Sequence, residues 1–318
     1  MKFSTLAKIT SASAIAFAAT FAGASYAQTA PTVTTYANGI TAPAGTVEVA
    51  GKLWVSDHVQ GFCRLDVPAS GGAAAINAST CITTAISAGQ PSFDGTYLYL
   101  PDNSSKSQGV WRLTYSASAG RFITATTSSN RPVIVARIGG NRPTATALVG
   151  GNLYIGALKN GNITRVTNPG GTTPGAATTV GRTSDGRGAA SLASLGGNLY
   201  IAEGAGVSSI PTDANALTAC GRPCVASLLT SSFITSPTAI ASNGESLFIA
   251  DATNEVIKYT PGTDPDFPDG TEEIYVPGGK FRFISGLGIN SGSTTLYVGD
   301  DPTDGNGVAQ GHIYRVTP

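Results

Sequence analysis

Apolar residues recur along the chain in short runs, each of which ends in a polar, often acidic, residue. Six runs open with leucine: Leu53-Trp54-Val55, Leu98-Tyr99-Leu100, Leu153-Tyr154-Ile155, Leu199-Tyr200-Ile201, Leu247-Phe248-Ile249 and Leu296-Tyr297-Val298. A second apolar run follows each of them after a polar turn, as in Phe62-Cys63-Arg64-Leu65. Short apolar runs bounded by turn residues predict β-strands joined by tight turns.

The spacing of these runs indicates how the strands are arranged. The leading leucines stand at 53, 98, 153, 199, 247 and 296, which gives separations of 45, 55, 46, 48 and 49 residues. Such periods are typical of propeller blades, each a four-stranded sheet. Segments of small residues opened by proline, such as Pro43–Val47 and Pro237–Ala241, precede most runs and suit an innermost strand. We therefore expect an all-β fold, a six-bladed β-propeller.

The ends of the repeat array predict how the ring closes. The chain stops at Pro318, directly after the third strand of the last repeat. The segment Thr32–Ala37 precedes the first inner strand, and we expect it to supply the missing fourth strand of the last blade. A ring closed in this way has no open edge between its first and last blades. The alternative, a solenoid, would carry capping repeats, and we find none.

The N-terminus has the features of an export signal. Lys2 and Lys8 flank an alanine-rich apolar run from Ile9 to Ala24, which ends in Ser25-Tyr26-Ala27. This pattern predicts cleavage after Ala27, so that residues 1–27 are a signal peptide and residues 28–318 a single propeller domain. The alternative, a membrane anchor, is disfavoured because serine and threonine interrupt a run that is short for a span. We expect a periplasmic or secreted protein without an integral membrane segment.

Composition narrows the classes of partner. Charged residues make up 12% of the chain, and the formal net charge is zero. Without a basic stripe, nucleic acid is excluded as an expected partner. The expected partner is therefore a small molecule, a glycan or a protein.

Four cysteines, Cys63, Cys81, Cys220 and Cys224, are present. An even number in an exported chain indicates disulfides. Four cysteines allow three pairings, of which proximity favours Cys63–Cys81 and Cys220–Cys224. The alternative, a redox or metal-binding thiol pair, lacks the C-x-x-C spacing and has no histidine nearby.

The repeat resembles a known family. A strand of Pro-x-Gly type, then Gly-x-Leu-Tyr-Val-x-Asp, then a basic residue within an Ile-x-Arg-Val strand is similar to the NHL repeat, and the likeness covers nearly all of residues 28–318. NHL and SMP-30 proteins are six-bladed propellers. The resemblance implies that the site lies on the face where second strands run into third strands. Because propellers carry many activities, it does not identify the function.

The SMP-30-type lactonases provide a specific comparison. They hold a divalent metal with a Glu at the start of the first inner strand and with an Asn and an Asp from other blades. Glu48, the candidate glutamate here, lies at the far end of its strand, and we find no clear equivalents of the other two residues. A Gly-x-Ser-x-Gly elbow is also missing. These departures count against a lactonase.

Acidic residues end the second strand in five of the six repeats: Asp57, Asp102, Glu203, Asp251 and Asp300. They could form a ring of carboxylates that binds a hard cation such as Ca²⁺. Alternatively, each carboxylate accepts N–H bonds from its own turn, a structural role. Recurrence at one point of every repeat favours the structural role. Further candidates on this face are Asn103 and the residues leading into the inner strands: Gln90, Arg142, Arg187, Ser236 and Arg282.

The two histidines, His58 and His312, belong to blades that adjoin across the predicted closure. With Asp300 and Asp301 they could form a metal site of two histidines and carboxylates, or an acid–base pair. The alternative is a pair of unrelated loop histidines.

Three functions follow from these patterns. The first is a binding or protein-interaction module that uses its loop-lined face. The second is a metal-dependent hydrolase, lactonase or lyase, with its site at the axial opening and a divalent cation such as Ca²⁺ as its cofactor. The third is a structural partner in a larger exported complex.

Overall fold

The structure is a computed structural model that describes residues 30–83, 88–104, 108–125, 131–139, 141–221, 223–229, 231–262, 270–290, 292–301 and 311–318. The predicted signal peptide, residues 1–27, lies outside the described residues, as do residues 263–269 and 302–310. None of the helices in these ranges is both long and apolar enough to cross a membrane.

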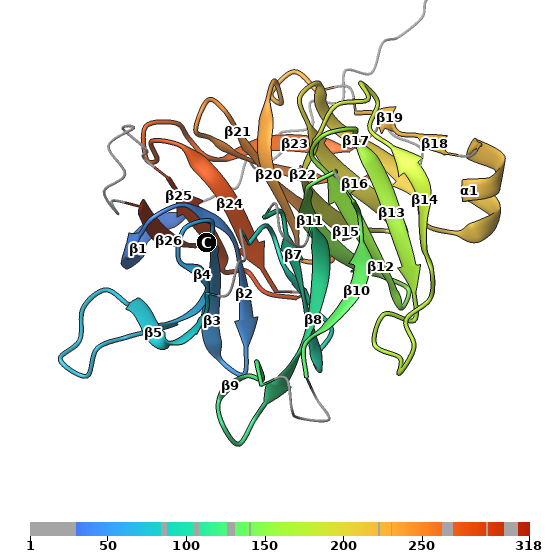
Figure 1. Cartoon of the computed structure of the whole chain (residues 1–318). Helices are drawn as coiled ribbons and strands as arrows, with labels where there is room; N and C mark the ends of the chain where they lie inside the picture. The colour runs from blue at the N-terminus through green and yellow to red at the C-terminus, as the bar shows by residue number, and fades with distance from the viewer. Residues whose placement is uncertain are drawn as a thin grey trace, which may run out of the picture.

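Six small sheets surround a common axis, and the chain forms a six-bladed β-propeller, as the repeat predicted (Figure 1). From inner to outer strand, blade 1 is β2 (Pro43–Val49), β3 (Lys52–Asp57), β4 (Gly61–Asp66) and β5 (Ala75–Ile82); blade 2 is β6 (Ser92–Phe93), β7 (Tyr97–Asp102), β8 (Gly109–Ser116) and β10 (Val133–Arg137); blade 3 is β11 (Pro143–Val149), β12 (Asn152–Ala157), β13 (Asn162–Thr167) and β14 (Ala177–Arg182). Blade 4 is β15 (Ala189–Leu195), β16 (Asn198–Glu203), β17 (Gly206–Pro211) and β19 (Ser227–Leu228); blade 5 is β20 (Pro237–Ser242), β21 (Leu247–Asp251), β22 (Val256–Thr260) and β23 (Thr271–Val276); blade 6 is β24 (Ile284–Ile289), β25 (Leu296–Asp300), β26 (Gly311–Thr317) and β1 (Thr32–Ile40).

Three further elements lie outside this plan. The short strand β9 (Arg121–Phe122) pairs with β8, and β18 (Cys224–Val225) adds in parallel to the outer edge of blade 3. The helix α1 (Ala214–Cys220) follows blade 4's third strand, and the Asp213 side chain caps it by accepting the N–H groups of Asn215 and Ala216. Side-chain capping of this kind explains why a helix begins there.

The second strand of each blade is buried on both faces, which explains its continuous apolar run. Residues 53–57 of β3 are all buried, and β12 and β16 show the same pattern. Each blade is covered on both sides by its neighbours, so this strand lacks the polar face that a one-sided sheet would have. Of the aromatic residues that follow the leading leucine, Trp54, Tyr99 and Tyr154 are fully buried, whereas Tyr297 of blade 6 is partly buried.

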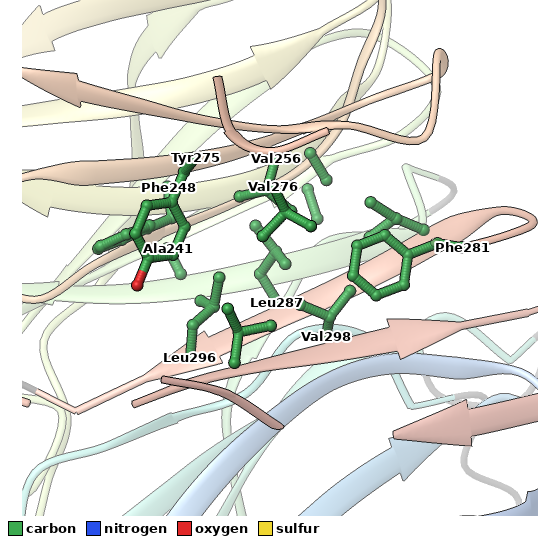
Figure 2. Close-up of a cluster of buried hydrophobic side chains, with 13 residues drawn as sticks. Ala241, Phe248, Val256, Tyr275, Val276, Phe281, Leu287, Leu296 and Val298 are labelled. Carbon is green, nitrogen blue, oxygen red and sulfur yellow. The ribbon is translucent and has the colours of Figure 1, made fainter. Parts of the chain in front are cut away.

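Contacts between blades form the hydrophobic core. In one cluster, Phe248 and Tyr275 of blade 5 pack beside Leu287, Leu296 and Val298 of blade 6 (Figure 2). Related clusters recur between other blades. Because the buried apolar area lies between blades, each blade depends on its neighbours for stability.

The ring closes as the sequence predicted. β1 pairs antiparallel with β26, from Thr32 opposite Thr317 to Ile40 opposite Gly311. Figure 1 shows the blue β1 beside the dark red β26 at the edge of blade 6. The N-terminal strand therefore completes the last blade.

Both expected disulfides are present. Cys63–Cys81 joins β4 to β5 within blade 1, and Cys220–Cys224 joins the end of α1 to β18. No described cysteine is free.

Candidate functional site

The resemblance to NHL and SMP-30 proteins led us to expect the site on one face of the ring. We call it the loop face, because the loops between second and third strands and the loops leading into inner strands form it. Asp57 shows how this face is built. Its Oδ2 accepts the N–H groups of Thr41 and Ala42 at 2.7 and 3.1 Å, and its Oδ1 accepts those of Val59 and Gln60 at 2.7 and 2.8 Å. One fully buried carboxylate thus holds two separate loops together.

Asp251 repeats this arrangement in blade 5. Its Oδ2 accepts the N–H groups of Thr235 and Ser236 at 2.8 and 2.7 Å, and its Oδ1 accepts that of Thr253 at 3.1 Å. Burial raises the pKa of the Asp251 carboxyl, but the backbone N–H donors, Ser236 foremost, outweigh it, and the net pKa lies below the ordinary value. The charged form is the one that the loops bind.

The other strand-end acids make comparable contacts. Asp300 Oδ1 accepts the N–H groups of Arg282 and Phe283 at 3.0 and 2.8 Å. Glu203 Oε1 accepts the N–H and hydroxyl of Ser184 at 3.2 and 2.6 Å. These are the contacts that the structural role requires.

Asp102 differs in one of its partners. Its Oδ1 accepts the Ser104 N–H at 2.9 Å, whereas its Oδ2 accepts the Trp111 indole N–H at 3.2 Å. Asn103, also predicted for this face, follows it and is partly buried. In blade 3, where Ala157 stands in place of the acid, the Lys159 N–H donates directly to the Asn141 carbonyl at 3.3 Å.

The two histidines lie on adjoining blades, but they have different partners. The ring nitrogen His312 Nδ1 lies 2.8 Å from Asn38 Oδ1 on the outer strand β1. The backbone N–H of His58 donates to the Ala42 carbonyl at 3.0 Å. Although much of His58 is exposed, desolvation by the surrounding loops lowers the pKa of its ring, against the opposing effect of Asp57.

The described residues, which include His58, His312, Asp300 and Asp301, hold no group of three or more His, Cys, Asp or Glu side chains that could bind a metal ion. The two-histidine metal site therefore stays a prediction without structural support.

Cations gather on the loop face where blades 3 and 4 meet. Arg142, Lys159, Arg182 and Arg187 are all exposed. A methyl group on Gly186 would lie 2.6 Å from Arg182 Nη2, which places that guanidinium over the loop carrying Arg187. Neither ion pair found among the described residues, Arg64–Asp66 or Lys258–Glu273, involves any of these four cations. We call Arg142, Lys159, Arg182 and Arg187 the basic cluster.

An exposed apolar side chain lies within this cluster. Leu158 is 42% exposed, and a methyl group on Gly188 would lie 2.9 Å from its Cδ1. Three more exposed apolar residues belong to loops of the same face: Val59, Phe233 and Phe283. Of these four residues, Leu158 is the one that lies beside the basic cluster.

The sequence led us to expect Gln90 on the loop face. In the structure, Gln90 lies inside the ring instead. From blade 2 its side chain crosses the axis: Nε2 donates to the carbonyls of Leu192 and Ile240 at 3.0 and 3.2 Å, and Oε1 accepts the Leu192 N–H at 3.0 Å and the Ser191 hydroxyl at 2.6 Å. It therefore links blade 2 to blades 4 and 5.

A cavity of about 240 Å³ extends from Gln90 toward the opposite face, which we call the hairpin face because the turns joining first and second strands form it. The cavity is lined by the final halves of the six inner strands. Sequence reasoning missed this cavity. A signal was present, since Gln90 occupies the position where the other five repeats carry Gly45, Ala145, Ser191, Ala239 and Gly286.

No known protein family matches the sequence, and no curated protein matches it either. Solved structures of six-bladed propellers share the fold. A Trichoderma reesei structure of carbohydrate-active enzymes family AA12 is 15% identical, aligning 91% of this chain with 97% of its own at a TM-score of 0.62. The PQQ-bound aldose sugar dehydrogenase of Streptomyces coelicolor is 15% identical, with 90% and 98% covered and a TM-score of 0.58.

A structure of a nidogen/laminin complex is also similar, at 14% identity, with 70% of this chain and 76% of the other covered and a TM-score of 0.50. At these identities the likeness concerns the fold alone. The neighbours thus include both oxidoreductases and a protein–protein complex.

Proposed function

We propose that this chain is an exported, NHL-like propeller, a single domain over residues 28–318, that binds a protein partner through its loop face. The observation that carries the proposal is the basic cluster around Leu158, whose cations form no ion pair with a described carboxylate. The strand-end acids of the same face do not offset it, because they are buried and bound to backbone N–H groups.

The partner's chemistry follows from this asymmetry. Unpaired arginines attract carboxylates and speed their approach, and arginine is enriched at the energetic centres of protein interfaces. Leu158 adds an apolar contact beside them. An acidic protein segment with an apolar side chain fits both features. A sulfated glycan would match the charge but not the apolar contact.

The loop that carries Arg187 is held in place before binding. The Thr183 N–H donates to the Gly161 carbonyl at 2.9 Å, and the Thr183 hydroxyl donates to the Arg187 carbonyl at 2.8 Å. Pre-ordered loops lose less conformational entropy on association, which supports a binding role.

Two features support export. The two disulfides fit an oxidising compartment, such as the periplasm or the exterior of the cell. The sequence signal at residues 1–27 points in the same direction.

Selection from a displayed peptide library tests the proposal. We expect peptides selected on the mature protein to combine Asp or Glu with an apolar residue. The double variant Arg142→Glu/Arg187→Glu should weaken their binding at least tenfold, roughly 1.4 kcal/mol or more. Leu158→Ser should weaken it to a smaller extent.

Lys52→Glu/Arg121→Glu is the matched control, because both residues are exposed on elements away from the loop face. Selection of neutral peptides, or equal loss of binding in the two charge-reversed variants, would contradict the proposal. A heparin column serves to separate protein from glycan recognition. Retention on heparin that depends on the basic cluster, without any peptide binding, would favour a glycan instead.

A further inference from the structure

The axial cavity on the hairpin face has the features of a ligand site rather than of a packing defect. Its floor is Gln90, and its lining residues Ser92, Phe93, Ser194 and Ser242 are only partly buried, so the cavity opens to solvent. Its volume of about 240 Å³ approaches the lower end of small-molecule sites, about 300–1,000 Å³.

Backbone polar groups line its walls. Each inner strand is the terminal strand of its sheet, so its axial edge has no neighbouring strand within that sheet. The bonds of Gln90 show that the Leu192 and Ile240 backbone groups face the axis. Since alternate residues of a strand direct these groups to the same edge, Ser194 and Ser242 present theirs to the cavity below Gln90.

Side-chain hydroxyls and amides add to this set of donors and acceptors. The Ser92 hydroxyl, which donates to Thr146 Oγ1 at 3.0 Å, lies on one side of the cavity and can still accept a hydrogen bond, and Asn290 is exposed at the rim.

Charge and apolar contacts define the ligand class further. None of the described residues that line the axial cavity carries a titratable side chain. An adjoining pocket, which shares Phe93 and Leu148 with it, contains the exposed acid Asp94, which would repel an anion. Phe93 offers an aromatic surface at the junction, suited to the C–H face of a saturated ring.

We propose that this cavity binds a neutral, polyhydroxylated small molecule, of the class of monosaccharides and cyclic polyols. Such a molecule pairs its hydroxyls with backbone N–H and C=O groups and carries no charge that the cavity would have to compensate. This site lies on the face opposite the basic cluster, so the proposal does not depend on the function proposed above.

Saturation-transfer NMR and calorimetry on the mature, oxidised protein test this proposal. The neutral probes are glucose, galactose, mannose and myo-inositol. We expect saturable binding of at least one of these probes with a Kd of about 1 mM or tighter, and at least about tenfold weaker binding of gluconate and glucuronate. Ser194→Leu should reduce binding at least about tenfold by filling the cavity, whereas the loop-face variant Leu158→Ser should not change it.

Asn290→Ala provides a second variant if Ser194→Leu fails to fold, because Asn290 is exposed and its side chain stands at the rim. It should weaken binding several-fold. The proposal is overturned if none of the four neutral probes binds saturably, if the anions bind equally well, or if binding survives both cavity variants. If none of the four neutral probes binds, the cavity is simply filled with water.

Discussion

The strand-end carboxylates Asp57 and Asp251 each tie together two loops that lie well apart in sequence. Asp57 reaches back 16 residues to Thr41 and forward three residues to Gln60, with all four of its hydrogen bonds made to backbone N–H groups. Bonds from backbone N–H to a charged acceptor are stronger than neutral ones. The acids therefore set the shape of the loop face rather than serve as its ligands.

We expect Asp57→Ala to lower the free energy of unfolding by about 3–5 kcal/mol, because it leaves buried N–H groups without an acceptor. Denaturation by urea under oxidising conditions measures this loss. Asp185→Ala, an exposed acid whose Oδ1 accepts only the Arg187 N–H among the described contacts, should change stability by less than about 1 kcal/mol. Equal effects of the two substitutions would refute the structural role.

The depressed pKa of Asp251 makes part of the stability depend on pH. Because the folded protein holds this carboxyl charged more strongly than the unfolded chain does, its contribution is complete above the unfolded pKa of about 3.9 and is lost as the pH falls through the lower folded pKa. The difference in melting temperature between the native protein and Asp251→Asn should therefore narrow below about pH 4.

Glu245→Gln, an exposed acid in the turn between the first two strands of the same blade, controls for the change in net charge. A difference between the native protein and Asp251→Asn that stays constant down to about pH 2.5 would show that the contacts of Asp251 do not favour its charged form.

At this scale the sequence predicted where the acids stand but not which backbone groups they bind. Recurrence at the end of Leu-Tyr-Ile-type strands placed Asp57 and Asp251 in turns. Their second partners, at Thr41 and Thr235, belong to loops that approach only when the blade folds. The sequence predicted that His58 and His312 lie on adjoining blades. It did not predict that the Asn38 side chain binds His312, because this contact depends on the register of β1 against β26.

The inner strands approach one another so closely that glycine is required at their contacts. A methyl group on Gly286 would lie 2.6 Å from the Gly45 nitrogen, and one on Gly89 would lie 1.9 Å from the Thr144 carbonyl oxygen. Hydroxyls stitch neighbouring strands: Thr238 donates to the Ile284 carbonyl at 2.6 Å, and Ser285 donates to that of Pro43. Gln90 then binds the axial edges of β15 and β20 from across the ring.

Gln90→Glu tests this role with almost no change of shape. At pH 7 a carboxylate would face the carbonyl oxygens of Leu192 and Ile240, and we expect a loss of about 2–4 kcal/mol in the free energy of unfolding. Protonation of the introduced carboxylate restores one hydrogen-bond donor. The loss in the free energy of unfolding should therefore become smaller as the pH falls from 7 to about 4.5. Asn290→Asp, the same chemical change at the exposed rim, should be nearly neutral.

An equal cost for the two substitutions, or a cost for Gln90→Glu that does not depend on pH, would show that Gln90 does not donate across the axis. Thermal unfolding monitored by circular dichroism at several pH values provides both readings.

Strands and blades could be predicted from the sequence because their apolar runs and spacing repeat. The axial cavity could not, because it depends on the space left between the ends of the six inner strands beside Gln90, and that geometry leaves no periodic trace. The unusual size of Gln90 among small residues at its position was the one local sign.

At the scale of the whole molecule, the ring depends on the pairing of β1 with β26. Ala37 and Ile40 of β1 are fully buried, and Tyr36 packs edge-on against Tyr297 with ring centroids 5.4 Å apart. Without β1, the outer edge of β26 would be open to pairing with other chains.

A mature chain lacking residues 28–40 should therefore melt at a lower temperature and self-associate. A synthetic peptide of residues 30–40 should bind it and raise its melting temperature, since an extended peptide adds to an open sheet edge. A peptide with proline in place of Thr34 and Tyr36 is the control, because proline cannot donate to the ladder. Light scattering and fluorescence anisotropy measure the two effects. Equal binding of both peptides would contradict edge pairing.

The seam between β1 and β26 also sets the order in which the molecule can become stable during synthesis. Among the described strands β1 is made first and β26 last, so a product interrupted before β26 is an open arc whose end blades lack a neighbour. Exposed apolar surface of this kind attracts chaperones and proteases. We therefore expect fragments that stop short of Gly311 to be degraded, whereas chains that include β26 resist proteolysis.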